Sequence, residues 1–237
     1  MAKVTEQADR HEEMVAHMKG AAKSLAEKDL TFEERNLLAV GYTNVIGSRR
    51  SALRIISSIR AREDESGSPT LHLAQTYRNK LYQELETFSR DIIDLVDNHL
   101  LTYKGKPKEL LPEPRSFYMK MKADYYRYLA EFEDNAQKRT EATNDAQKYY
   151  LEAKEIAKAL VPTHTVRLSL MLNYAIFTAE VLHRPQDANA LMKEAFDDAL
   201  SVIDVLDEES YKDTTFLLQL MRDNFIKWIQ DDEEQGN

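Results

Sequence analysis

The chain has 237 residues, with six glycines, six prolines and no cysteine. So few turn-forming residues argue against a β-sandwich or barrel, which needs a turn about every 8–12 residues, and the missing cysteines exclude a disulfide scaffold. The formal net charge of −9 argues against nucleic acid or an anionic membrane as the main partner.

Targeting signals are also missing from the pattern. The first residues contain no apolar signal-peptide core, and no stretch approaches the roughly 18 apolar residues of a membrane span. We therefore expect a cytoplasmic location, with entry into the nucleus open to a protein of this kind. The last residues, 231–237, carry four acids and no large apolar side chain, which predicts a short acidic disordered tail.

The first half of the chain shows two clear helix starts. Thr31, with Glu34 three residues later, predicts a capping box. Segment 66–69 (Ser-Gly-Ser-Pro) predicts a loop that leads into a helix with proline in its first turn. That helix carries one apolar stripe over 70–104, at spacings of three and four residues. Segment 103–115, with three prolines, is expected to be the longest irregular stretch.

The second half is also rich in helical signals. Segment 115–161 is free of glycine and proline, with expected boundaries at Thr140–Ala142 and at Pro162–Thr163. Apolar stripes over 186–206 and 211–229 predict two further helices. No segment shows the alternation of apolar and polar residues with a period of two that is typical of a strand. The sequence therefore predicts an all-α fold of about nine mostly antiparallel helices.

Positive charge is concentrated in two segments of this acidic chain. Residues 36–62 contain five arginines and no acid, and residues 115–127 contain four basic residues against Asp124. On a helix, Arg50 and Arg54 share one face, while Lys120, Arg127 and Tyr128 share another. Arginine forks and a tyrosine hydroxyl suit a phosphate, although ordinary solvated faces with helix ion pairs would explain the same pattern.

Two later segments place asparagine beside leucine. Asn173 and Glu180 share a helix face, as do Leu220, Asn224 and Trp228. An asparagine amide can both donate to and accept from a peptide backbone. The alternative is that the apolar residues belong to the core and the asparagines have no role.

Four sequence blocks resemble the 14-3-3 family. They are 33–51 (from Glu-Glu-Arg-Asn-Leu-Leu to Asn-Val-Ile-Gly-Ser-Arg-Arg-Ser), 118–131 (Tyr-Met-Lys-Met-Lys-Ala-Asp-Tyr-Tyr-Arg-Tyr-Leu-Ala-Glu), 162–173, and 210–228 (from Ser-Tyr-Lys-Asp-Thr-Thr to Trp228). The likeness extends from about residue 6 to residue 228. It implies a single domain over 1–230, an all-α cup-shaped dimer with a concave amphipathic groove, and a non-enzymatic adaptor for phosphoserine or phosphothreonine clients.

The resemblance also implies roles for individual residues. The phosphate-binding group comprises Arg50, Arg127, Tyr128, Lys120 and Arg54. The peptide-binding group comprises Asn173, Asn224, Glu180, Leu172, Ile176, Leu217, Leu220 and Trp228. The dimer interface comprises Val4, Ala8, Arg10, Glu13, Ile56, Ile59, Tyr77, Lys80 and Glu84. Arg10–Glu84 and Glu13–Lys80 are the implied salt bridges between protomers. The dimer is either a homodimer or a heterodimer with a sister isoform. No catalytic residue, metal or cofactor is expected.

Several positions depart from the family pattern. Thr43 replaces a lysine of the phosphate pocket, Leu53 replaces a tryptophan, and Lys227 replaces a leucine of the apolar wall. Ala52 stands where some members carry a phosphorylatable serine. The first helix is also shortened. These departures predict weaker phosphate affinity and a repacked core.

Two other classes of function compete with the adaptor. A di-metal or zinc enzyme would need Glu-x-x-His pairs or a second histidine one turn on, and Glu13 with His17 is spaced one residue too far. A helical scaffold with weakened or phosphate-independent client binding is the alternative that the missing lysine at Thr43 favours.

Overall fold

The computed structural model describes the backbone of residues 1–235 and the side chains of residues 1–228. In this part of the chain the α-helices are α1 (Ala2–Gln7), α2 (His11–Ser24), α3 (Phe32–Glu65), α4 (Leu71–Leu95), α5 (Pro112–Phe132), α6 (Ala136–Ala157), α7 (Thr165–Glu180), α8 (Pro185–Leu200) and α9 (Glu208–Gln235). The predicted all-α fold of about nine helices is confirmed. None of the described helices is long and apolar enough to cross a membrane.

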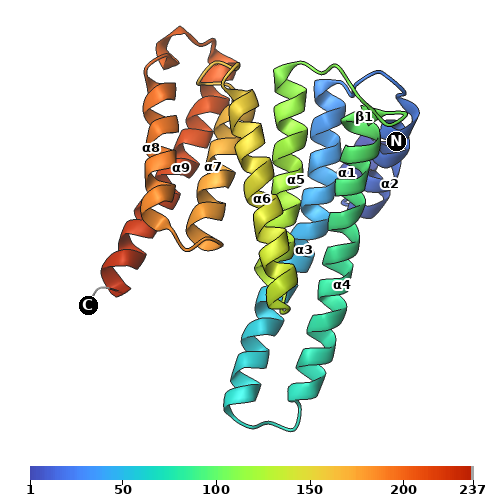
Figure 1. Ribbon diagram of the computed structural model, residues 1–237, viewed down its shortest axis with the longest axis vertical. Helices are drawn as coiled ribbons and strands as arrows, with labels where there is room; N and C mark the ends of the chain where they lie inside the picture. The colour runs from blue at the N-terminus through green and yellow to red at the C-terminus, as the bar shows by residue number, and fades with distance from the viewer. Residues whose placement is uncertain (236–237) are drawn as a thin grey trace. The chain divides into compact units, whose positions relative to one another are not determined.

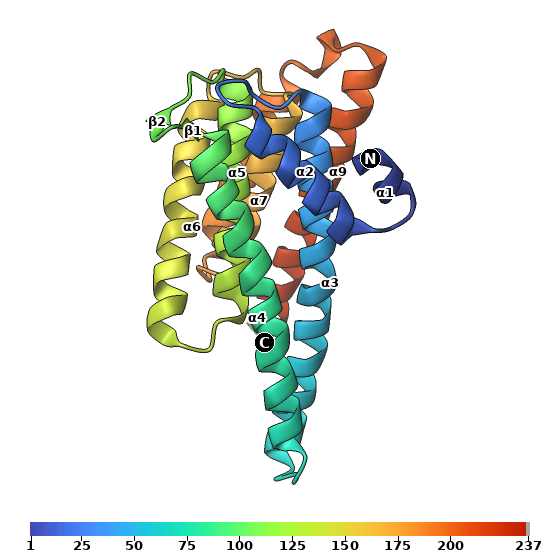
Figure 2. The same cartoon turned by 90° about the vertical axis from the view of Figure 1, so that its right-hand side faces the viewer.

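Short irregular elements complete the order. A π-helical turn, η1 (Val96–Leu100), continues α4, and a two-stranded antiparallel hairpin follows, formed by β1 (Thr102–Tyr103) and β2 (Lys106–Pro107). Figure 2 shows this hairpin near the end of α4. A 3-10 turn, η2 (Ile203–Val205), precedes α9. The predicted stripe over 70–104 therefore ends in a wider turn, which keeps Val96 and Leu100 buried.

The capping box that begins α3 is confirmed. The Thr31 hydroxyl accepts from the backbone N–H of Glu34 at 3.3 Å, and the Thr31 N–H donates to the Glu34 carboxylate at 2.8 Å. The boundary predicted at Thr140 is wrong, because α6 begins at Ala136. Asn135 caps that helix by accepting from the Lys138 N–H at 3.0 Å, while Thr140 donates to the Ala136 carbonyl inside the helix.

The described chain forms two compact units. Unit 1 comprises residues 1–110 and 128–142, and unit 2 comprises residues 111–127 and 143–235, so α5 and α6 each contribute residues to both. In unit 1, α3 and α4 are joined by a short loop and lie side by side (Figure 1). Helix α2 packs closely on α3, where a Cβ on Gly41 would lie 3.2 Å from Val15. Leu53, the predicted replacement for a tryptophan, is fully buried.

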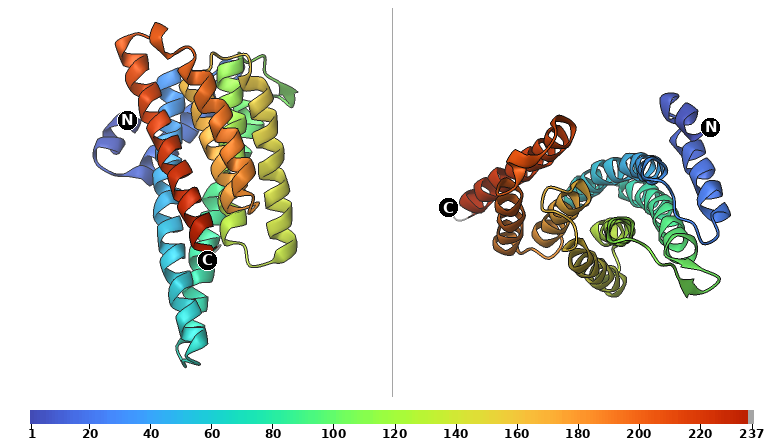
Figure 3. Two further views of the ribbon diagram at one scale, coloured as in Figure 1. Left: turned by 90° about the vertical axis from the view of Figure 1, so that its left-hand side faces the viewer. Right: turned by 90° about the horizontal axis from the view of Figure 1, so that it is seen from above.

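Unit 2 is built around α7, which packs against both α8 and α9. Helices α8 and α9 are visible together in the left view of Figure 3. One apolar cluster joins α7, α8 and α9 and includes Leu172, Met192, Met221 and Trp228. A second cluster joins α6 and α7 with part of α5 and includes the fully buried Tyr150, whose ring contacts Tyr174 and Phe177.

The sequence predicts that the folded domain ends at residue 230. Helix α9 continues to Gln235, so residues 231–235 of the predicted tail are helical in backbone. Residues 236 and 237 lie outside the described residues. The domain boundary and the disordered tail stay predictions.

Candidate functional site

A single carboxylate holds two arginines of unit 1. The Arg50 Nε and Nη2 atoms donate to one Glu131 oxygen at 3.0 and 2.8 Å, and the same atoms of Arg54 donate to the other oxygen at 3.0 and 2.6 Å. Because each guanidinium donates two charge-assisted hydrogen bonds to one oxygen, both side chains are fixed in position. The three charges sum to a net positive value.

Tyr128 supports the first of these arginines. The Arg50 Cζ atom lies 4.1 Å from the centroid of the Tyr128 ring, which is the distance of a favourable cation–π contact. Tyr128 is itself buried. Thr43 lies seven residues before Arg50 on α3, so both share a helix face, and its side chain is exposed. The position that departs from the family lysine is therefore open to solvent.

The second cluster lies in unit 2 around the buried Asp124. Its carboxylate accepts from Lys120 Nζ at 2.9 Å, from the Tyr150 hydroxyl at 2.5 Å, and from Asn173 Nδ2 at 2.9 and 3.0 Å. Arg127 Nε donates to the Tyr150 hydroxyl at 3.1 Å, and Arg127 Nη2 lies 3.8 Å from Asp124. Asp124 therefore joins residues of α5, α6 and α7 into one polar network.

The electrostatics of this network favour an ionised Asp124. Burial on its own would raise the pKa of the carboxyl, but the charges of Lys120 and Arg127 and the hydrogen bonds from Tyr150 and Lys120 lower it more. The pKa of Asp124 therefore lies below its ordinary value. Two cations against one anion leave this cluster net positive as well.

The predicted peptide-binding residues lie on α7 and α9 of unit 2. Leu172, Ile176, Leu217 and Leu220 share one apolar cluster, in which Leu172 is buried and the other three are half-buried. Trp228 is 5% exposed and belongs to the core of that cluster. The structure thus brings the apolar residues together and leaves part of their surface open.

The polar members of that group are also positioned by local contacts. Asn173 uses its amide nitrogen on Asp124, and Asn224 donates to the Leu220 carbonyl on its own helix at 2.8 Å. Glu180 is exposed at the end of α7, and Lys227 is exposed on α9. One of the two Asn224 amide hydrogens is therefore used within the helix, and the second hydrogen and the side-chain oxygen can serve a ligand backbone.

Two residues of these networks were missed in the sequence. Glu131 lies three residues after Tyr128 on the same helix, so helical spacing could have identified it. Tyr150 gave no signal, because only the packing of α6 against α5 within unit 2 brings its hydroxyl to Asp124 and Arg127. Both residues act on the predicted phosphate-binding side chains by holding them.

The predicted dimer residues lie on α1 to α4 and on the turn between α1 and α2 in unit 1. Val4 and Tyr77 are 59% and 52% exposed, Ala8 and Lys80 are exposed, and Ile56 and Ile59 are half-buried. Within the protomer, Arg10 pairs with Glu13, and Glu84 lies 3.3 Å from Arg49. Three of the four residues predicted for bridges between protomers therefore also have partners inside the chain.

The side chains of the two clusters are suited to recognising an anion. Guanidinium, ammonium and phenol groups donate hydrogen bonds, and both clusters carry excess positive charge. In the described part of the chain, no group of histidine, aspartate and glutamate side chains is arranged to hold a metal ion.

Comparison with known proteins gives the same family throughout. The model of the 14-3-3 protein family matches residues 1–229. The chain is 48% identical over 238 residues to the 14-3-3-like protein GF14-E of Oryza sativa, covering 100% of this chain and 88% of that protein. It is 46% identical over 239 residues to Protein BMH2 of Saccharomyces cerevisiae, covering 100% of this chain and 85% of that protein.

A third relative carries a functional description. The Checkpoint signal transducer rad24 of Schizosaccharomyces pombe is 46% identical over 235 residues, which cover 98% of this chain and 84% of that protein. Similarity of this extent spans every element from α1 to α9 rather than a single motif.

Proposed function

The chain belongs to the 14-3-3 family of non-enzymatic phosphoserine- and phosphothreonine-binding adaptors, and on that premise we propose which of its residues do the binding. Arg50, Arg127 and Tyr128 contact the phosphate, with Lys120 and Arg54 adding positive charge. Asn173, Asn224 and Glu180 take the backbone of the client segment. Leu172, Ile176, Leu217 and Leu220 take its apolar side chains, and Trp228 supports them from the core.

The observation that carries this assignment is the pairing of Arg50 and Arg54 with Glu131. One carboxylate carries a single negative charge, whereas a phosphoserine carries about 1.5 to 2 negative charges and three acceptor oxygens. The Nη1 atom of Arg50 makes no hydrogen bond to Glu131, so this edge of the fork can face a phosphate while Glu131 holds the other edge. Preorganised donors lose less conformational entropy on binding.

Asp124 holds Arg127 in a similar way to that in which Glu131 holds Arg50. Its carboxylate and the Tyr150 hydroxyl orient Lys120 and Arg127. A phosphate beside this cluster is attracted by Lys120 and Arg127 and repelled by Asp124. The negative charge of Asp124 is already compensated by the hydrogen bonds that it accepts. The phosphate-independent scaffold that Thr43 favoured is not supported by the family assignment, and the loss of a lysine there is expected to weaken binding without abolishing it.

We further propose that the chain acts as a dimer, as a homodimer or with a sister isoform, and that it works in the cytoplasm with access to the nucleus. Exposed Val4 and Tyr77 support an interface on unit 1. Two phosphate-binding grooves in one dimer would bind a doubly phosphorylated client with added avidity. Such an adaptor clamps, masks or bridges its clients, and neither nucleic acid nor membrane is a proposed partner.

The assignment is tested by calorimetry with a phosphoserine peptide and its unmodified twin. We expect binding of the phosphopeptide alone, and a loss of at least tenfold in affinity for Arg127→Ala. Arg139→Ala is the matched control, because Arg139 is an exposed arginine outside both clusters. Equal affinity for the two peptides would overturn the function, and unchanged binding by Arg127→Ala would overturn the assigned residues.

A further inference from the structure

An apolar pocket on unit 2 has no part in the function proposed above. It lies between α8 and α9, has a volume of about 240 Å³, and is lined by Met192, Lys193, Phe196, Met221, Arg222 and Phe225. Each helix contributes a methionine and a phenylalanine four residues apart, so each pair shares a helix face.

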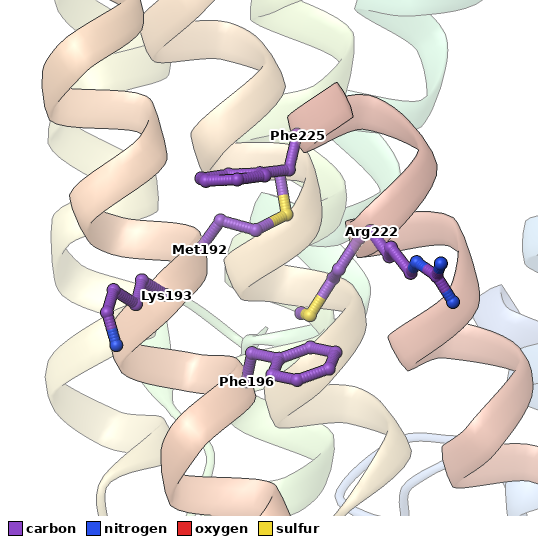
Figure 4. A pocket seen from close by; sticks show the side chains of 6 residues that line it. Met192, Lys193, Phe196, Arg222 and Phe225 are labelled. Carbon is purple, nitrogen blue, oxygen red and sulfur yellow. The ribbon is translucent and has the colours of Figure 1, made fainter. Parts of the chain in front are cut away.

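The arrangement of the lining residues is that of a slot with aromatic walls. In Figure 4 the rings of Phe196 and Phe225 lie on opposite sides of the cavity, and the Met192 thioether lies between them. Met192 and Met221 are buried, while both phenylalanines are half-buried. Thioethers and ring faces make favourable contacts with a further aromatic or large aliphatic group.

The size of the slot suits one side chain. Pockets for small-molecule ligands usually measure about 300–1,000 Å³, and this cavity is smaller. Protein interfaces, in contrast, are centred on single aromatic or aliphatic anchors that enter well-packed pockets. The dimensions therefore favour an anchor residue of a protein over a free ligand.

The charges at the rim select the neighbours of that anchor. Lys193 and Arg222 extend from opposite edges of the slot (Figure 4). Lys193 is paired with Asp197 at 2.5 Å, so its charge is compensated. Arg222 is exposed and makes no ion pair with any described side chain. One uncompensated cation at the rim is complementary to a carboxylate next to the anchor.

The slot adjoins the peptide-binding residues but opens on another side of α9. Met192 and Met221 belong to the same buried cluster as Leu217, Leu220 and Trp228. Phe225, in contrast, lies about 100° round the helix from Asn224 and about 140° from Leu220. A client whose phosphorylated segment is held on one face could therefore present a second element to the other. Tethering raises the effective concentration of such a second contact.

We propose that the slot between α8 and α9 is a second client-docking site, which takes a large apolar side chain, preferably aromatic, that is flanked by a carboxylate. The apolar side chain fills the space between Phe196 and Phe225, and the carboxylate pairs with Arg222. This site does not rest on phosphate binding, and its occupation is independent of Arg50 and Arg127.

The test uses methyl-labelled methionine, because Met192 and Met221 report directly on the slot. The probes are the peptides acetyl-Asp-Trp-Asp-amide, acetyl-Lys-Trp-Lys-amide and acetyl-Asp-Ala-Asp-amide, each added to the full-length protein saturated with a phosphopeptide. We expect saturable shifts of the Met192 and Met221 methyl signals with the first peptide, and at least fivefold weaker binding of the other two.

Variants separate the two parts of the proposal. Arg222→Glu changes an exposed residue and should reverse the preference for acidic flanks, so that the Lys-Trp-Lys peptide binds more tightly than the Asp-Trp-Asp peptide. Phe225→Ala should abolish the shifts, whereas Phe216→Ala, which removes a 65% exposed ring elsewhere on α9, should leave them unchanged.

Four results would overturn the proposal. These are unmoved methyl signals at Met192 and Met221, equal affinity for the acidic and basic peptides, indole-3-acetate binding as tightly as the acidic peptide, and shifts that follow protein concentration. The third would assign the slot to a free aromatic acid, and the fourth to a second copy of this chain.

Discussion

The hydroxyl of Tyr150 is the smallest group whose removal should disturb the Asp124 network. The change Tyr150→Phe keeps the fully buried ring in its cluster and deletes one oxygen. That oxygen accepts from Arg127 at 3.1 Å and donates to Asp124 at 2.5 Å. The substitution leaves the buried Arg127 Nε without this acceptor and removes one donor from a buried carboxylate.

The expected cost follows from those two bonds. Hydrogen bonds to charged groups contribute about 1.5–3 kcal/mol each, and a buried donor left unpaired costs about 1–3 kcal/mol. Since Lys120 and Asn173 continue to donate to Asp124, we expect a net loss of about 2 kcal/mol in the free energy of unfolding. For a chain of this size that corresponds to a drop in Tm of about 4–8 °C.

The assay is urea unfolding, with Tyr149→Phe as the matched control. Tyr149 is the preceding residue on α6, its ring stacks on Tyr126 at 5.6 Å between centroids, and its hydroxyl makes no hydrogen bond within the described chain. The control should lie within about 0.5 kcal/mol of wild type, as expected for a change away from such networks. Equal stability of the two variants would refute the view that the Tyr150 hydroxyl holds Arg127 and Asp124.

Three further predictions concern charge. Thr43→Lys restores a cation on the face of α3 that carries Arg50, so phosphopeptide affinity measured by calorimetry should rise severalfold and depend more steeply on salt; no change at low salt would place residue 43 outside the reach of the phosphate. Because the pKa of Asp124 is lowered, its charge stabilises the fold above the ordinary pKa of about 3.9 and loses that effect as pH falls through the lowered value. Asp124→Asn should accordingly destabilise the protein most near pH 7, and a urea-unfolding difference that grows on acidification would contradict this sign. Glu13→Lys should shift sedimentation toward monomer and Glu13→Lys with Lys80→Glu should restore the dimer, whereas failure of the second change to restore it would remove this salt bridge from the interface.

Much of the fold can be predicted from the sequence, because helix caps and apolar stripes depend on residues that are close together in the chain. The Thr31 and Glu34 pair predicted a cap that depends on residues three apart, and the apolar stripes predicted helices at similar spacings. The boundary at Thr140 failed because Asn135 is an equally good capping residue that lies nearer to the end of α5. Local propensity could not choose between two such caps.

The site is harder to predict from the sequence, because the contacts among its side chains depend on how the helices pack. Spacing on one helix grouped Lys120 with Arg127, yet it could not show that Tyr150 and Asn173, from two other helices, complete the shell around Asp124. Glu131 lies within helical spacing of Tyr128, but its contacts are with Arg50 and Arg54 of another helix, which spacing along one helix does not show. The residues that hold the arginines are thus the ones that structure added.

A ³¹P NMR titration of a phosphoserine peptide bound to the protein tests directly whether Arg50 and Arg127 contact the phosphate. Free phosphoserine loses its second proton with a pKa of about 6. If Arg50 and Arg127 contact the phosphate, they favour the dianion, and the bound phosphoserine should titrate at a lower pKa, with the shift reduced in Arg127→Ala. A bound phosphate that titrates like the free peptide would show that these arginines do not contact it.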